Sequence, residues 1–150
     1  MARLSGLIAL CLLLSTAAYA KDLPGLDGDI LQEDVLEAQP TILIVWTTWS
    51  PRCRDVVQRV NAIHQRWAGK ALVATVVFQE EPEDIRLFLD RQKAQGNALQ
   101  ASVYLDRDGS FSKENSVTSL PGLIILKRGD PAFRGKLPAD PHPLIERTLR

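Results

Sequence analysis

Cysteine and histidine are scarce in this sequence of 150 residues, which contains two of each. Cys11 lies inside an N-terminal apolar run, so Cys53 is the only thiol in the rest of the chain. A single thiol cannot form an internal disulfide bond, and any disulfide must join Cys53 to another molecule. His64 and His142 are far apart in the sequence, and two distant histidines with one cysteine do not make a metal site. We therefore expect no metal and no cofactor.

The sequence also lacks an excess of either charge, because 18 Lys and Arg residues balance 18 Asp and Glu residues. Loss of residues 1–20 would remove one basic residue, Arg3, and no acidic residue. A balanced charge argues against nucleic acid as a partner. Internal repeats, low-complexity tracts and a dividing linker are absent as well. These features predict a single domain, which we expect to be a monomer.

The N-terminus has the pattern of a secretory signal peptide. Arg3 precedes an apolar run over residues 7–14, and the small residues Ala18 and Ala20 end the segment. We predict a signal peptide over residues 1–20, a domain over residues 21–150, and a periplasmic or secreted location. The apolar stretch from residue 4 to residue 20 is close to the shortest membrane-spanning helix, about 17 residues, so an uncleaved membrane anchor is the alternative. Cys11 lies within the apolar run, which argues against its acylation.

Alternating patterns in the remaining sequence predict an α/β fold. The unbroken apolar run Thr41–Trp46 is typical of a central strand that is covered on both faces. Ser50 and Pro51 are suited to the N-cap and the first position of a helix that ends at Gly69. Residues at steps of three and four form its apolar stripe: Cys53, Val56, Val57, Val60, Ile63 and Trp67.

The second half of the sequence continues this alternation. Strands are predicted over residues 71–78, 101–105 and 123–126, with a hairpin partner over residues 132–136. Helices are predicted to begin at Pro82 and after Asp140–Pro141, where we expect His142 to be solvated. Strands that alternate with helices and end in a hairpin and a helix indicate a central mixed β-sheet flanked by helices.

The segment from Trp46 to Arg54, which contains Trp49-Ser50-Pro51-Arg52-Cys53, resembles the Trp-Cys-x-x-Cys segment of thioredoxin-like proteins. The exported TlpA/ResA-type thiol-disulfide oxidoreductases are the subgroup that it resembles most. The turn over residues 106–109, the segment Val117–Pro121 and a later Gly-Asp hairpin extend the resemblance from about residue 25 to the end. The resemblance implies a thioredoxin-like fold in which Pro121 is a cis-proline facing the active-site turn. It also implies that Leu120 offers its backbone to an extended substrate and that Trp49 lies at the mouth of the site.

The same resemblance implies dithiol exchange, in which the first cysteine attacks a disulfide as thiolate and the second resolves the mixed disulfide. Ser50 occupies the attacking position, and a serine hydroxyl forms no bond to sulfur, so two-cysteine turnover within this chain is excluded. Related sites also carry an acid at positions that are here Ile44 and Val56. The proton-handling residue is therefore expected to be missing together with the nucleophile.

Cys53 is left as the candidate reactive group, with Ser50 beside it. Arg52, Arg54 and the start of a helix favour a thiolate, whereas the place of Cys53 on the apolar stripe opposes one. We assign catalysis to Cys53 and Ser50. The residues expected to bind substrate are Trp49, Pro51, Arg52, Leu120 and Pro121.

Three functions fit these residues. In the first, Cys53 acts as a monothiol that forms a mixed disulfide with a thiol- or disulfide-bearing protein or a small thiol. In the second, the domain is a redox-silent binding or adaptor module. In the third, Ser50-x-x-Cys53 works as in peroxiredoxin-like thiol peroxidases, although Trp46 stands seven residues before Cys53, where that family has a proline.

Overall fold

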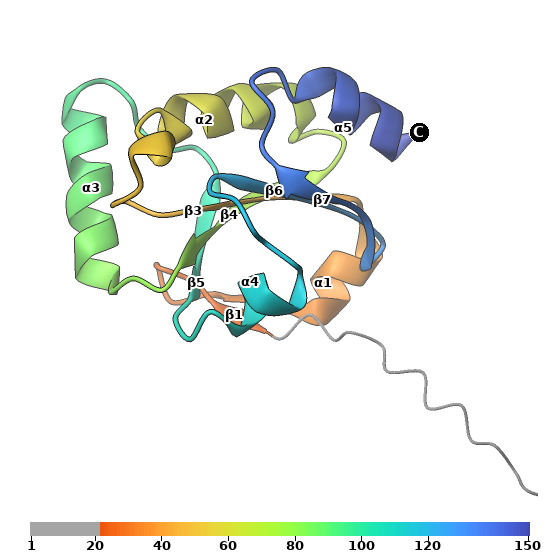
Figure 1. Ribbon diagram of the computed structural model, residues 1–150, viewed down its shortest axis with the longest axis horizontal. Helices are drawn as coiled ribbons and strands as arrows, with labels where there is room; N and C mark the ends of the chain where they lie inside the picture. The colour runs from red at the N-terminus through yellow and green to blue at the C-terminus, as the bar shows by residue number, and fades with distance from the viewer. Residues whose placement is uncertain (1–21) are drawn as a thin grey trace, which may run out of the picture.

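A computed structural model describes residues 22–150 (Figure 1). The predicted signal peptide, its cleavage and the alternative membrane anchor concern residues outside this range. Within residues 22–150, no helix combines the length and the apolar character that crossing a membrane requires.

A five-stranded mixed sheet forms the centre of the molecule, in the order β5-β4-β3-β6-β7. Its strands are β3 (Thr41–Trp46), β4 (Leu72–Phe78), β5 (Ser102–Asp106), β6 (Gly122–Lys127) and β7 (Asp130–Lys136). Strands β3, β4 and β5 run parallel, whereas β6 is antiparallel to both β3 and β7. The prediction of an α/β fold with a central mixed sheet is confirmed.

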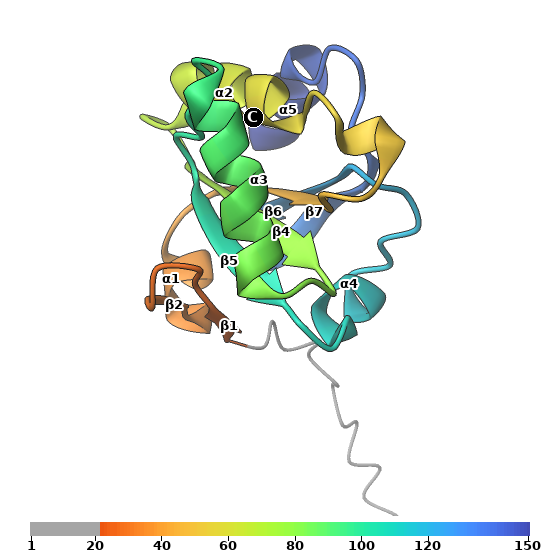
Figure 2. The ribbon, with the colours of Figure 1, turned by 90° about the vertical axis from the view of Figure 1, so that its left-hand side faces the viewer.

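Helices cover both faces of this sheet (Figures 1 and 2). Helices α2 (Val56–Trp67), α3 (Pro82–Ala94) and α5 (His142–Leu149) pack on one face, where they meet Ile42, Ile44 and Trp46 of β3. Helices α1 (Glu33–Ala38) and α4 (Ser110–Glu114) lie on the other face with Leu43 and Val45. Alternate residues of β3 thus enter two cores, because successive side chains of a strand point to opposite faces.

The short elements were not all predicted. The N-terminal segment forms a small hairpin of β1 (Leu23–Pro24) and β2 (Ile30–Leu31), and Gly25 forms a bridge to Tyr104 in β5. Helix α4 was also missed. The buried carboxylate of Asp106 holds its first residues by accepting hydrogen bonds from two backbone N–H groups and one hydroxyl.

The helix predicted from Ser50 to Gly69 is wrong as a single helix. Pro51–Cys53 form a separate 3₁₀ turn, η1, and helix α2 begins only at Val56. Asp55 separates the two with φ −103° and ψ 16°, which lies in the bridge region rather than in the α region. The predicted apolar stripe is nevertheless confirmed, because all six of its residues are buried.

Candidate functional site

The predicted site residues lie where β3 ends. Residues 47–50 connect β3 to η1, which carries Pro51, Arg52 and Cys53. Pro121 precedes β6, and the next residue, Gly122, pairs with Val45 near the end of β3. The sheet register therefore brings Pro121 to the start of the connecting loop, although more than 60 residues separate them in the sequence. The peptide bond between Leu120 and Pro121 is cis.

Ser50 occupies the N-cap position of η1, but its side chain makes no capping hydrogen bond. An N-cap side chain normally accepts a hydrogen bond from the N–H of the second or third helical residue. The third residue here is Cys53, and its N–H already donates to the Ser50 carbonyl oxygen at 3.0 Å in the 3₁₀ turn. The Ser50 hydroxyl therefore does not cap this turn, and the prediction that it does so is wrong. The Ser50 backbone N–H donates instead to the Thr47 hydroxyl at 3.3 Å.

Cys53 is buried, with 1% of its surface exposed. It belongs to the core between the sheet and α2, together with Trp46, Val56 and Val57. Its neighbour Arg52 is exposed and lies on the solvent side of η1. A reagent can therefore reach the sulfur only if this part of the chain opens.

The surface of the site consists of residues that carry no thiol. Trp49 is 64% exposed, somewhat more than the other exposed large apolar residues Ile30 and Leu87, and Pro51 and Arg52 are exposed beside it in the sequence. Leu120 is half-buried, and Pro121 is buried at the start of β6. We use the name front surface for the exposed residues Trp49, Pro51 and Arg52 together with the half-buried Leu120 and the buried Pro121.

Glu80 is a residue of this site that the sequence analysis missed. It follows β4, and its carboxylate accepts hydrogen bonds from the Thr48 backbone N–H at 2.9 Å and from the Thr48 hydroxyl. Ile44 and Val56 occupy the positions where related sites carry an acid, and both are buried apolar residues. Because parallel strands end at the same edge of a sheet, an acid directly after β4 could have been expected near the end of β3.

Comparison with known proteins assigns the chain to a family. The model of the AhpC/TSA family matches residues 15–129, which is most of the chain. The chain belongs to the AhpC/TSA family. Its sequence is 28% identical over 119 residues to the thiol:disulfide interchange protein DsbE of Escherichia coli. The match covers 79% of this chain and 60% of DsbE, so the chain spans less than two thirds of the curated relative.

Solved structures share the fold of this AhpC/TSA family member. A secreted Mycobacterium tuberculosis disulfide oxidoreductase superposes with a TM-score of 0.69 at 14% identity, covering 89% of this chain and 98% of that one. StoA from Bacillus subtilis gives a TM-score of 0.63 at 21% identity, with 85% and 95% covered. The predicted thioredoxin-like fold is confirmed by these structures, and the sequence is similar to that of DsbE.

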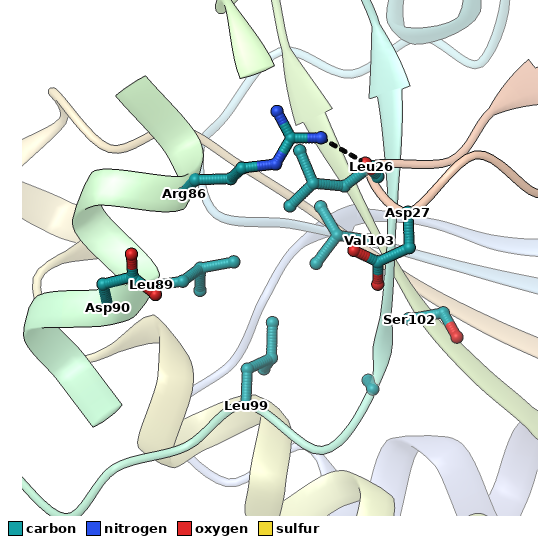
Figure 3. Close-up of a pocket in the computed structure, with 9 residues that line it drawn as sticks. Leu26, Asp27, Arg86, Leu89, Asp90, Leu99, Ser102 and Val103 are labelled. Carbon is teal, nitrogen blue, oxygen red and sulfur yellow. Dashed lines mark hydrogen bonds between the residues drawn. The ribbon is translucent and has the colours of Figure 1, made fainter. Parts of the chain in front are cut away.

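The family member also has a hollow of about 300 Å³ beside the amino-terminal part of β5 (Figure 3). Leu89 and Leu99 line it, and Asp27 and Asp90 contribute carboxylates from different walls. Arg86 closes one end by donating to the Leu26 carbonyl oxygen at 2.7 Å, which ties α3 to the N-terminal segment. None of the predicted site residues lines this hollow. Among residues 22–150, no group of three or more His, Cys, Asp or Glu side chains is arranged to hold a metal ion.

Proposed function

We propose that this chain is an exported thioredoxin-like protein that binds a thiol- or disulfide-bearing partner at its front surface without dithiol turnover. The observation that carries the proposal is the contrast between Trp49, which is 64% exposed, and the only thiol of the described residues, Cys53, which is 1% exposed. Ser50 stands at the attacking position, so the surface retains contact residues but no nucleophilic sulfur. The geometry therefore favours binding over catalysis.

The proposed location rests on the N-terminal sequence and on relatives. Residues 1–20 have the pattern of a cleaved export signal, and one structural neighbour is a secreted disulfide oxidoreductase. Another, from Streptococcus pneumoniae, is an exposed lipoprotein thioredoxin with a TM-score of 0.69 at 17% identity, covering 85% of this chain and 96% of its own. We infer a periplasmic or secreted domain.

Monothiol exchange through Cys53 is the second candidate, and the weak local hold on η1 favours it. Two backbone bonds close this turn, from Cys53 N–H to the Ser50 oxygen at 3.0 Å and from Arg54 N–H to the Pro51 oxygen at 3.4 Å, and the second is long. After local opening, the Cys53 thiolate would attack a partner disulfide, and the partner's other sulfur would leave as a thiolate and take up a proton. An external thiol would then release the partner from the mixed disulfide. Burial of Cys53 argues against a peroxidase, because peroxide must reach the sulfur.

Alkylation of Cys53 separates the two candidates. In the binding function, iodoacetamide reacts only with the small globally unfolded fraction, and a stability of about 5 kcal/mol slows alkylation by more than about 1,000-fold relative to protein in urea. In the monothiol function, a local opening of about 2 kcal/mol slows it by only about 30-fold. If the protection of Cys53 from alkylation falls steadily as urea is added, the result supports binding alone. If this protection stays constant at low urea concentrations, the result supports the monothiol function.

A gain-of-function variant tests whether the front surface still accepts a disulfide substrate. Ser50→Cys restores the dithiol pair, and we expect it to reduce a disulfide-bonded test peptide in the presence of an external reductant. Ser50→Ala is the matched control, because it alters the same side chain without adding a thiol. If Ser50→Cys forms no mixed disulfide and reduces no peptide, the front surface does not bind such partners and the proposal fails.

A further inference from the structure

We propose that Glu80 is a positioning residue of the front surface, because its carboxylate holds the β3–η1 loop through Thr48. The inference rests on the proposed function, since it concerns how Trp49 and Ser50 are presented to a bound partner. Neither the sequence pattern nor the thiol chemistry predicted a role for this carboxylate.

The contact between Glu80 and Thr48 is bidentate. Oε2 accepts the Thr48 backbone N–H at 2.9 Å, and Oε1 accepts the Thr48 hydroxyl. Both groups are partly buried, so water competes less for them than at an open surface. The two residues are 32 positions apart, and the contact therefore links the end of β3 to the end of β4.

Thr48 lies in a stretch of the site where no strand pairing fixes the backbone. The β3–β4 ladder ends at the pair Trp46 and Val77, and η1 begins only at Pro51. Between them, the Thr47 hydroxyl accepts the Ser50 N–H, while Glu80 accepts both donors of Thr48. The exposed ring of Trp49 therefore projects from a segment that is anchored on each side by a side-chain oxygen.

The negative charge of the carboxylate strengthens this contact. A carboxylate has two acceptor oxygens, and both are used here. In Glu80→Gln the amide oxygen can accept the Thr48 N–H and the amide N–H can donate to the Thr48 hydroxyl oxygen, so two neutral hydrogen bonds replace two charge-assisted ones and the contact weakens by roughly half. Thr48→Val removes the hydroxyl but keeps the backbone N–H, and thus breaks half of the contact.

Amide hydrogen exchange measured by NMR tests the anchoring directly, without any partner. In Glu80→Gln we expect exchange of the Thr48 N–H to accelerate by at least about tenfold, while the amides of α2 keep their protection. Glu81→Gln is the matched control, because Glu81 is the adjacent acid and pairs with the exposed Arg107 at 2.6 Å instead of the loop. Unchanged Thr48 exchange in Glu80→Gln would overturn the inference. Thr48→Val should accelerate exchange at Trp49 and Ser50, and this variant decides the matter if Glu80→Gln does not fold.

A kinetic measurement then tests the link to binding. In the Ser50→Cys background, we expect Glu80→Gln to raise the KM for the disulfide test peptide by about tenfold, which corresponds to 1.4 kcal/mol of binding energy, while kcat changes little. The assay is run well below the melting temperature of the double variant, so that unfolding cannot produce the KM change. Unchanged KM would show that the loop is held but not used for binding, and this outcome would overturn the positioning role. If Ser50→Cys alone is inactive, the proposed function fails, and the exchange experiment still decides whether Glu80 anchors the loop.

Discussion

Replacement of Asp106 by alanine should destabilise the protein strongly and loosen the approach to Pro121. The carboxylate is 1% exposed and accepts three hydrogen bonds, from the Phe111 N–H at 3.1 Å, the Ser112 N–H at 2.9 Å and the Ser112 hydroxyl at 2.6 Å. These bonds begin α4, and the Ser112 carbonyl oxygen in turn accepts the Val117 N–H at 2.9 Å. Asp106 therefore holds the chain that leads into the front surface.

The size of the effect follows from these contacts. A hydrogen bond to a charged group contributes about 1.5–3 kcal/mol, and three bonds to one carboxylate are not additive, so we expect Asp106→Ala to lower the free energy of unfolding by about 3–5 kcal/mol. With an m-value of about 2 kcal/mol/M, the urea midpoint should fall by about 2 M. Asp106→Asn keeps one acceptor oxygen, and we expect it to lose about half as much.

Urea denaturation followed by circular dichroism measures this loss. Glu114→Ala is the matched control, because it removes an exposed acid from α4 itself and leaves the buried hydrogen bonds in place. If Asp106→Ala costs less than about 1 kcal/mol, or no more than Glu114→Ala, then the buried carboxylate does not hold α4 and the reasoning is wrong.

Three further outcomes are expected. Ser50→Ala should change the free energy of unfolding by less than about 0.5 kcal/mol in urea, because the hydroxyl caps nothing; a loss near 1 kcal/mol would indicate a cap. His142→Ala should lower the free energy of unfolding in urea by about 1–3 kcal/mol, since it removes the acceptor at 3.1 Å from the buried indole N–H of Trp67. An unchanged free energy of unfolding would show that this hydrogen bond does not stabilise the fold. Burial, and then the hydrogen bond and charge of Asp29, raise the pKa of Tyr104, so the unfolded state ionises first and stability should fall as pH rises past about 10. Tyr104→Phe should flatten this alkaline decline, and an unchanged decline would place its origin elsewhere.

Local sequence patterns predicted the larger elements because their signals lie within a few residues. The apolar run Thr41–Trp46 and the stripe from Cys53 to Trp67 gave correct burial, and Pro82 marked the start of α3. The break at Asp55 was missed, since an apolar stripe at steps of three and four does not distinguish one helix from a 3₁₀ turn followed by a helix.

The contacts that complete the site could not be read from such patterns, because they join residues far apart in the sequence. The Thr48–Glu80 contact spans 32 positions, and the hydrogen bond between Trp67 and His142 spans 75. His142 was accordingly expected to be solvated, whereas it accepts a hydrogen bond from a buried indole. The exposure of Cys53 likewise depended on how η1 packs against the sheet, which no local pattern specifies.

Because the three tryptophans differ in exposure, intrinsic fluorescence can report on the front surface. Trp46 and Trp67 are 1% and 4% exposed, whereas Trp49 is 64% exposed on the front surface. Iodide in solution should therefore quench the emission of Trp49 and leave the other two indoles bright. A ligand that covers the front surface would protect the Trp49 emission from iodide. A titration of iodide quenching against ligand concentration would therefore measure binding without a label or a mutation.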